Sequence, residues 1–520
     1  MRSSKSNLRA MLLLTATWFA APAAADERSL TLQQALEMAL KSNETLIGSR
    51  ESLAAAGEME YGARGAYDPA LELSGASQRS TQPVNSVLPS PLTGSLAPEV
   101  RSTQAGMTAH QLLPTGGVLS LRANGSRQTS DGAFTLLSPA YGAQLGAELR
   151  QPLLRDRMMD AAHLTMAVTT ADRRGAESSF RRTLNETLAA VEKSYWGLVS
   201  ARQEVGVREE AVRLAAEQLE ETRTRVASGS APGTELAQPR AELGRRQAEL
   251  FAAHEDLARA DHRLKLLILA DDDAAPWGVT IAPVDTGATD SVAIDREAWV
   301  HRALAGRPEI GSYQAQVERR RAETTHARDA ERPALDAVVS YDRYGLAGSA
   351  NPVGAGGAPP GLGGDLANAL HSLGNDGFDA FRAGLVLGFP VGNRAARGET
   401  ESARHLELDA ESELARARKA IRVEVLDAAA ALETATRRIE ATRMAREAAE
   451  IQLAAEQDRY RAGQSTNFLV LTRQNDLSAA QLDEIAARTD FLTARTEVAR
   501  ATGSLAEDRG IDAASLGGTR

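Results

Sequence analysis

Two long stretches of the chain, residues 155–226 and 395–462, carry apolar side chains at helical spacing. Neither contains proline, and glycine is rare in both. The apolar positions of the first stretch include Leu184, Leu188, Val191, Tyr195 and Leu198. This periodicity predicts amphipathic helices of roughly 100 Å, at about 1.5 Å per residue. Because a rod of that length needs packing partners along its whole length, we expect each one to fold back at a glycine, Gly229 or Gly463, into a helical hairpin of coiled-coil type.

Shorter segments alternate between apolar and polar residues, which is the pattern of a β-strand with one apolar face. The clearest examples are residues 141–150 and 380–390. We expect their apolar side chains to face lipid, and these are Phe381, Leu385, Leu387, Phe389, Tyr141, Leu145 and Leu149. Partner strands are predicted at 71–75 and 334–345. A strand of a soluble sandwich would alternate in the same way, so the interpretation depends on several such strands beside long helices in an exported chain.

The first half contains an additional candidate hairpin at residues 104–126. Two alternating segments flank a Pro-Thr-Gly-Gly turn sequence. Since the helices before and after the strands must lie on one side of a membrane, the number of strands in each half is even. We predict two strands in the second half and either two or four in the first. We favour four, with the hairpin extending the sheet; otherwise it is a loop outside the membrane.

The order of elements indicates a duplication. Ala39 and Arg225 of the first half align on Ala303 and Arg459 of the second, so two similar units build one architecture. The predicted segments are a signal peptide at 1–25, a first repeat at 26–270, a linker at 271–290, a second repeat at 291–505 and a C-terminal tail at 506–520. The first repeat opens with a helix and continues with strands at 68–150, a long helix at 155–226 and a helix at 234–270. The second repeat also opens with a helix and continues with strands at 334–345 and 380–390, a long helix at 395–462 and a helix at 466–503. The acidic run and prolines of the linker predict irregular structure.

The N-terminal segment predicts export from the cytoplasm. Arg2, Lys5 and Arg9 precede an apolar run over residues 10–21, and the alanines at 23–25 match a signal-peptidase site. No later segment is apolar over the about 20 residues that a membrane-crossing helix needs. A membrane-spanning part would therefore be a β-barrel, whose strands satisfy their backbone hydrogen bonds in lipid.

Composition excludes several classes of protein. A formal net charge of -10 disfavours nucleic-acid binding, and the absence of cysteine excludes disulfides, a thiol nucleophile and a lipid-acylated cysteine. His254 and His262 lack further ligands at metal spacing, and residues 375–379 lack the alternating acidic positions of a calcium loop. No phosphate-binding glycine loop or nucleophile elbow is present. We therefore predict no enzyme activity, no cofactor and no metal site.

In its order of elements the chain resembles the TolC-like outer membrane factors, the exit ducts of Gram-negative efflux pumps and type I secretion systems. The resemblance rests on the opening helix at 30–40, the strand exits at 151–154 and 389–394, and the reversal at 460–471. It implies a mostly α fold with a transmembrane β region. Each protomer of a homotrimer would add long helical hairpins to a periplasmic α-barrel and strands to a shared β-barrel in outer membrane lipid. It also implies a periplasmic adaptor (membrane fusion) protein and an inner-membrane RND or ABC transporter as partners.

The resemblance further suggests a gate at the periplasmic tip, where in the family an acidic residue can bond a basic one close to an aromatic ring. Here the basic position falls on Ser465, and the family's acidic rings fall on Leu469 and Thr472. We therefore expect a hydrogen-bonded or hydrophobic constriction in place of a salt bridge and an acidic ring. The candidate tip residues are Thr234, Glu235, Tyr460, Ser465, Asn467 and Phe468. Alternatively, Phe468 and Leu471 only pack the hairpin turn.

The predicted function is a passive exit duct in the cell outer membrane, with a long periplasmic extension, an N-terminal signal peptide and no lipid anchor. An adaptor and an inner-membrane transporter would open it at the tip. The competing hypothesis is a periplasmic coiled-coil scaffold or adaptor without a membrane barrel, which would lack lipid-facing strands. The sequence identifies neither the cargo nor the transporter.

Overall fold

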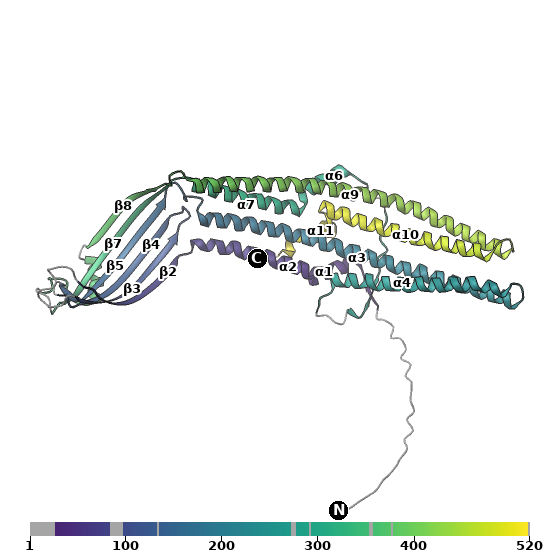
Figure 1. Ribbon diagram of the computed structural model, residues 1–520, viewed down its shortest axis with the longest axis horizontal. Helices are drawn as coiled ribbons and strands as arrows, with labels where there is room; N and C mark the ends of the chain where they lie inside the picture. Colours follow the sequence, from purple (N-terminus) through teal and green to yellow (C-terminus); the bar gives the residue numbers. More distant parts are fainter. Residues whose placement is uncertain are drawn as a thin grey trace, which may run out of the picture. The chain divides into compact units, whose positions relative to one another are not determined.

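The computed structural model describes residues 27–83, 97–132, 135–271, 277–290, 293–352, 357–375 and 378–517 (Figure 1). The predicted signal peptide lies outside these residues. The chain divides into two compact units. The hairpin unit comprises Met1–Ile47, Glu186–Ile294 and Ala428–Arg500, and the sheet unit comprises Gly48–Asn185, Asp295–Asp427 and Ala501–Arg520. Each unit therefore combines segments from both halves of the sequence.

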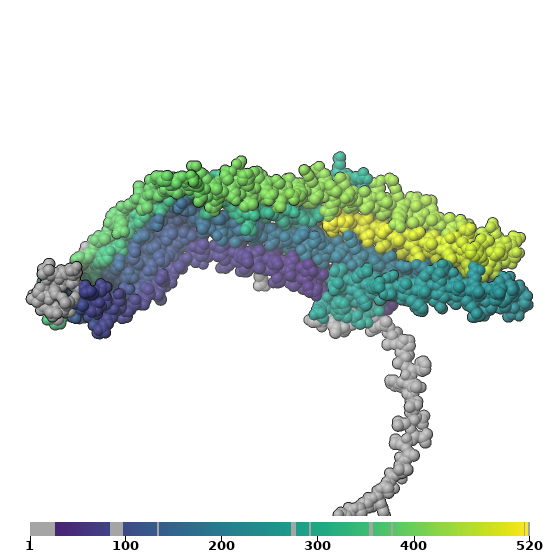
Figure 2. Space-filling view, viewed as in Figure 1, coloured from purple at the N-terminus to yellow at the C-terminus, as the bar shows by residue number. Residues whose placement is uncertain are grey.

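The hairpin unit is built from two long helical hairpins and a small sheet. Its elements are β1 (Glu27–Leu30), α1 (Leu32–Ser42), η2 (Gly233–Leu236), α4 (Ala237–Ile268), β6 (Thr280–Pro283), most of α10 (Asn467–Thr502), and parts of α3 (Ala161–Ala227) and α9 (Arg394–Arg461). In Figure 1, α4 returns beside α3, and α10 returns beside α9. Arg438 of α9 pairs with Asp490 of α10 at 2.6 Å, and the space-filling view shows these two helices packed against each other (Figure 2). Among the described residues, no helix combines the length and the apolar character needed to cross a membrane.

Both hairpins turn at a glycine in the left-handed conformation. Gly229 has φ 74° and Gly463 has φ 73°, a region that residues with a Cβ rarely adopt. The amide of Ser230 donates to the carbonyl of Arg225 at 2.9 Å, and the amide of Gln464 donates to that of Arg459 at 2.8 Å. This is the Schellman arrangement that ends an α-helix. The two repeats thus end their long helices in the same way, as the aligned arginines predict.

A buried tyrosine holds the small sheet against α3. Tyr195 is fully buried, and its hydroxyl lies 2.9 Å from the carbonyl oxygen of Leu30 and 2.9 Å from the carboxylate of Asp285. Burial, together with the hydrogen bond to Asp285 and the charge of that carboxylate, raises the pKa of Tyr195 to about 12. Asp285 lies in the segment expected to be an irregular linker, but that segment contains strand β6, which pairs in parallel with β1. A strand of four residues is too short to leave a periodic signal in the sequence.

The sheet unit contains a six-stranded antiparallel sheet in the order β2-β3-β4-β5-β7-β8, visible in Figure 1. The strands are β2 (Ala70–Thr81), β3 (Glu99–Leu112), β4 (Val118–Ser130), β5 (Leu137–Pro152), β7 (Ala334–Ala350) and β8 (Asp379–Gly388). The remaining elements are most of α2 (Glu44–Ala63), η1 (Arg64–Tyr67), α6 (Arg296–Gly306), α7 (Pro308–Ala330), α8 (Leu366–Asn375), α11 (Leu505–Asp508), α12 (Ala513–Leu516), and the other parts of α3 and α9. The predicted class, mostly helical with an antiparallel sheet, is confirmed.

The additional hairpin of the first half belongs to the sheet. β3 pairs with β2 on one side and β4 on the other, and β4 pairs with β5. The first half therefore supplies four strands and the second half two, which is the larger of the two predicted counts. The turn between β3 and β4 contains Gly116 at φ 76°, where an added Cβ would lie 2.1 Å from the carbonyl oxygen of Asp156. A glycine is needed at this close approach.

From the absence of proline we predicted that the long helix of the first half begins at residue 155. In the structure it begins at Ala161. β5 ends at Pro152, and Asp156 then adopts φ 64°, which interrupts any helix. The side chain of Asp160 accepts a hydrogen bond from the amide of His163 at 2.8 Å, so this residue satisfies a free amide at the helix start. The predicted start of this helix was too early because it relied on helix-forming composition and not on a capping residue.

Helix α8 is a further element that the sequence did not predict. It follows a Gly/Pro-rich stretch between β7 and β8. Ala369 of α8 is buried against Ala143 of β5 and Ala347 of β7, and an added Cβ on Gly345 would lie 1.9 Å from the carbonyl oxygen of Ala369. Small residues therefore let the helix backbone rest directly on the sheet.

We predict that Gly345→Ala displaces α8 without unfolding the sheet, because the new methyl group cannot fit beneath Ala369. Amide hydrogen exchange in α8 should accelerate at least about tenfold, since the helix depends on this contact. Gly384→Ala is the matched control, because an added Cβ on Gly384 of β8 has nothing within 4 Å. Equal exchange of α8 in both variants would contradict the packing described here.

Candidate functional site

The turns of the two hairpins enclose a polar cavity of about 440 Å³. Its lining contains all six residues predicted for the tip, namely Thr234, Glu235, Tyr460, Ser465, Asn467 and Phe468, together with Arg225, Gln238 and Thr466. Thr234 and Glu235 come from η2, which follows the first turn, and Asn467 and Phe468 begin α10 after the second. The two turns thus bring the candidate residues together from both halves of the chain.

Arg225 joins the two hairpins, and we did not predict it as a tip residue. Its guanidinium donates a hydrogen bond from Nη1 to the Tyr460 hydroxyl at 2.5 Å. The guanidinium carbon also lies 5.5 Å from the centroid of the Tyr460 ring, within the range of a cation–π interaction. The signal in the sequence was the alignment of Arg225 on Arg459, which marked the position without giving its partner.

A second polar contact forms within the second hairpin. The hydroxyl of Ser465 donates to the carboxylate of Glu456, which is buried in α9, and Arg459 lies 3.6 Å from the same carboxylate. Ser465 occupies the position where the resemblance implied a basic residue. Here it is a hydrogen-bond donor to its own hairpin, so the second turn is held by a hydroxyl and not by a salt bridge to Glu235.

The start of α10 shows which tip residues pack and which remain free to contact something else. Leu471 is 5% exposed and packs the hairpin, whereas Phe468 is 61% exposed. The side-chain oxygen of Asn467 is buried and has no hydrogen-bond partner among the described residues. Of the two residues that could merely pack the turn, only Leu471 does so within this chain.

The sheet has one apolar and one polar face, because partners in an antiparallel register lie on the same face. Leu71, Leu121 and Tyr341 belong to one such row, which ends at Phe381 on β8. We call the face that carries this row the apolar face. Its large exposed side chains include Leu71, Leu73, Met107, Leu121, Leu145, Leu149, Val339, Tyr341, Phe381, Leu385 and Leu387.

Six of the seven predicted lipid-facing residues lie on the strands of this face, and the seventh, Phe389, directly follows β8. Phe381, Leu385 and Phe389 are 68%, 69% and 64% exposed. Side chains of this size rarely stay exposed together in a soluble monomer. The apolar face is therefore a large exposed apolar surface of the described chain.

The polar face carries charged pairs and amides. Arg122 pairs with Glu148 at 2.9 Å, and Arg150 pairs with Asp336 at 2.5 Å. The Gln144 amide donates to Asp342 at 3.1 Å. A hollow of about 620 Å³ lies at the glycines between these strands. This face is compatible with water, so the sheet can separate an aqueous space from an apolar one.

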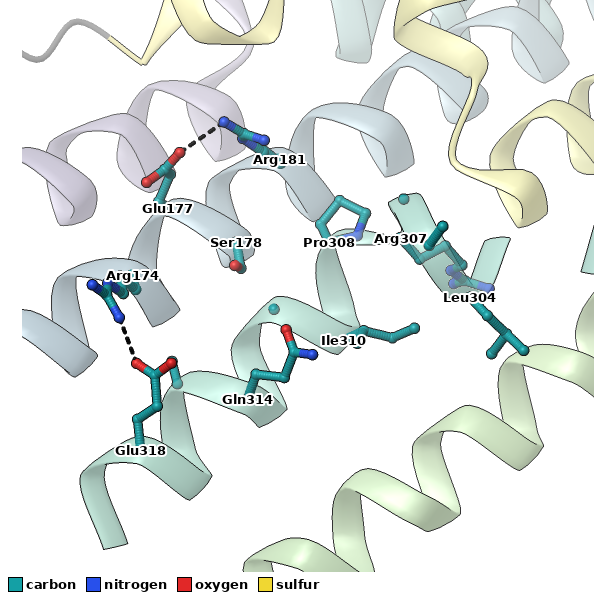
Figure 3. Close-up of a pocket in the computed structure, with 14 residues that line it drawn as sticks. Arg174, Glu177, Ser178, Arg181, Leu304, Arg307, Pro308, Ile310, Gln314 and Glu318 are labelled. Atoms are coloured by element: carbon teal, nitrogen blue, oxygen red, sulfur yellow. Dashed lines mark hydrogen bonds and ion pairs between the residues drawn. The ribbon is translucent and has the colours of Figure 1, made fainter. Parts of the chain in front are cut away.

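A further cavity of about 360 Å³ lies between α3 and α7 in the sheet unit (Figure 3). Arg174 bridges the two helices to Glu318 at 2.7 Å, and Arg181 pairs with Glu177 on its own helix at 2.7 Å. Gly311 and Ser178 let the helices approach closely. Arg307, which also lines the cavity, pairs with Glu309 and Glu424. The charged side chains of this cavity thus already have partners within the chain, which indicates a packing seam.

Residues 299–504 match the family model described as outer membrane efflux protein. The matched residues make up less than half of the chain. Its fold is similar to that of the CmeC outer membrane channel of Campylobacter jejuni, at 16% identity and a TM-score of 0.64, over 91% of this chain and 86% of that one. It is also similar to the outer membrane protein VceC of Vibrio cholerae, at 16% identity and a TM-score of 0.62, over 91% and 96% of the two chains. The MtrE channel of Neisseria gonorrhoeae, in its open state, matches at 15% identity and a TM-score of 0.61, over 92% and 90%. Comparison with curated protein sequences gives no match.

The match supports the predicted resemblance to outer membrane efflux proteins over residues 299–504. The match covers the second half of the chain, and the fold extends the likeness to the first half. The roles of the tip residues and of the lipid-facing residues remain predictions, which rest on the geometry above.

We predict that Arg225→Met loosens the tip, because Tyr460 loses both its hydrogen bond and its cation. Amide exchange in the last turns of α9 should accelerate about three- to tenfold. Arg223→Met is the matched control: Arg223 is on the same helix but pairs only with Glu220 of its own turn, at 3.0 Å. If both variants leave exchange in α9 unchanged, Arg225 does not hold the hairpins together.

Proposed function

We propose that the protein is the outer-membrane exit duct of a tripartite efflux pump or a type I secretion system. The observation that carries this proposal is the two-faced sheet joined to long helical hairpins. The apolar face would contact outer membrane lipid, and the polar face would line an aqueous passage. A periplasmic scaffold or adaptor, the competing function, has no need for a row of exposed Leu and Phe side chains on a sheet.

The sheet also supports assembly into a homotrimer. β2 and β8 each pair with one neighbouring strand within the described chain, so their outer edges are unpaired there. In lipid an unpaired backbone group costs several kcal/mol, at about 2–7 per group. β2 of one copy would pair with β8 of the next, and three copies of the six-stranded sheet would close a ring of about eighteen strands, a size that leaves an aqueous channel.

The tip would be the closed end of this duct. Arg225 and Tyr460 tie the two hairpins of one protomer together at 2.5 Å, and the exposed Phe468 ring would close the passage from the side. A periplasmic adaptor would dock its own helices on the turns at residues 227–236 and 462–471, and an inner-membrane RND or ABC transporter would supply the energy. The protein itself would be a passive conduit, delivered to the outer membrane through the signal peptide at 1–25.

Single-channel recording in planar bilayers tests this function. The wild-type protein should conduct, and Tyr460→Ala combined with Glu235→Ala should raise its conductance at least about twofold, because the constriction loses its ring and its carboxylate. Arg443→Ala is the control, since the ion-pair partner of this α9 residue in the described part of the chain is Glu447 of its own helix, at 3.9 Å.

An unchanged conductance in the double variant, with a conducting wild type, would contradict the gating role of the tip alone. A soluble monomer without conductance would contradict the duct itself and favour the periplasmic scaffold.

A further inference from the structure

Three arginines lie on the apolar face of the sheet, at the end where β2 ends and β3 begins. In the strand register, Arg79 of β2 lies directly opposite Arg101 of β3, and Arg127 of β4 lies opposite Thr103 of β3. Like charges opposite each other in a sheet are unfavourable, and here the Glu99 carboxylate bridges Arg79 and Arg101. We call this surface the distal patch, and its members are Ser77, Arg79, Arg101, Thr103, Arg127 and Tyr141.

The distal patch consists mainly of hydrogen-bond donors. Ser77, Thr103, Arg127 and Tyr141 form one continuous row across four strands. Hydroxyl and guanidinium groups in such a row suit an anion with several oxygens, because arginine presents a planar fork of N–H donors that fits phosphate.

The charges of the patch are only partly neutralised. The Arg79 and Arg101 side chains are 66% and 64% exposed, and both contact Glu99. Asp131 accepts a hydrogen bond from the Glu99 amide at 2.7 Å. Arg127 is exposed and makes no ion pair with any residue that the structure describes. Among the described residues, Arg79 and Arg101 therefore share one carboxylate, and Arg127 has none.

The position of the patch relative to the apolar side chains suggests its ligand. The row of Leu73, Met107 and Leu145 lies four positions from the row of Ser77, which is about 14 Å along a strand. Only small residues lie between these rows. A ligand bound at the patch could thus place apolar chains over the leucine row and polar groups at the arginines.

Helix α8 borders the patch on the same face. An added Cβ on Gly125, in the row between the leucines and Arg127, would lie 3.7 Å from Leu366 of α8. Leu366 and Leu370 are 40% and 52% exposed. The helix therefore adds apolar surface next to the arginines, as a phosphorylated lipid requires.

We propose that the distal patch binds the phosphate groups of an acylated, phosphorylated glycolipid in the outer leaflet. This inference rests on the proposed function, which places the remote end of the strands at the outer surface. Basic clusters beside an apolar membrane surface attract anionic head groups. Here the guanidinium groups hold the phosphates, the hydroxyl row contacts the sugars, and the leucines with α8 contact the acyl chains.

The test measures binding of a bisphosphorylated, acylated diglucosamine lipid to the full-length oligomer in detergent, against the same lipid without its phosphates. The phosphorylated lipid should bind at least about tenfold more tightly, with an affinity that falls as salt rises. The variant with Arg79→Gln, Arg101→Gln and Arg127→Gln should lose this preference. The control carries Arg382→Gln on the polar face of β8, with Arg437→Gln and Arg443→Gln on α9, so that net charge is matched and the preference is kept.

Equal binding of the two lipids by the wild type would overturn the inference, and so would an undiminished preference in the distal variant. Competition by excess inorganic phosphate down to the level of the dephosphorylated lipid would also overturn it, because the site would then be one for free phosphate. Should the distal variant fail to assemble, the lipid comparison and its salt dependence in the wild type decide the question. Conductance of the same sample in planar bilayers separates this outcome from failure of the proposed function: a conducting protein without lipid preference contradicts the inference alone.

Discussion

The structure depends on the two unpaired edges of its sheet. Backbone N–H and C=O groups at the edges of β2 and β8 have no partner in the described chain, and one face of the same sheet is covered with exposed leucine and phenylalanine side chains. A single chain in water would have to tolerate both, which is the situation that leads to aggregation. The proposed pairing between copies in lipid would satisfy the edges and cover the apolar face together.

The helical hairpins, unlike the sheet, have packing partners within the chain. Their seams contain small residues and many ion pairs, such as Arg438 with Asp490, and exposed pairs of this kind contribute little stability each. Larger contributions come from buried anchors such as Tyr195. At the tip, by contrast, the hairpins are held by one arginine on one tyrosine and by Ser465 on Glu456. The contact between the two hairpins would have to break if the tip opens as proposed.

The sequence predicts the features that repeat locally. Helical periodicity placed α9 within one residue of its observed ends, and the glycines at 229 and 463 gave both turns. Alternation identified the apolar face, including Phe381 and Leu385. All six candidate tip residues line one cavity because each lies within six residues of a glycine turn, Tyr460 before Gly463 and the others after Gly229 or Gly463, and the repeats are aligned.

The missed features depend on tertiary contacts. Arg225 and Tyr460 are 235 positions apart, so no window of sequence shows their contact. Helix α8 packs on the sheet because Gly345 and Ala143 leave room for it. The residues just before the helix are rich in glycine and proline, so local sequence did not predict a helix there. The choice between two and four strands in the first half required the register between β3, β4 and β5, which periodicity does not contain.

Disulfide crosslinking between copies tests most directly whether the edges of the sheet meet. The chain has no cysteine, so single cysteines at Glu72, Ser74 or Ala76 of β2 can each be combined with one at Gly384 of β8 and oxidised in the membrane. The account predicts that at least one combination gives covalent dimers and trimers, and that cysteines on β2 alone or β8 alone do not. Insertion of the protein without crosslinks in any combination would contradict pairing of β2 with β8 between copies.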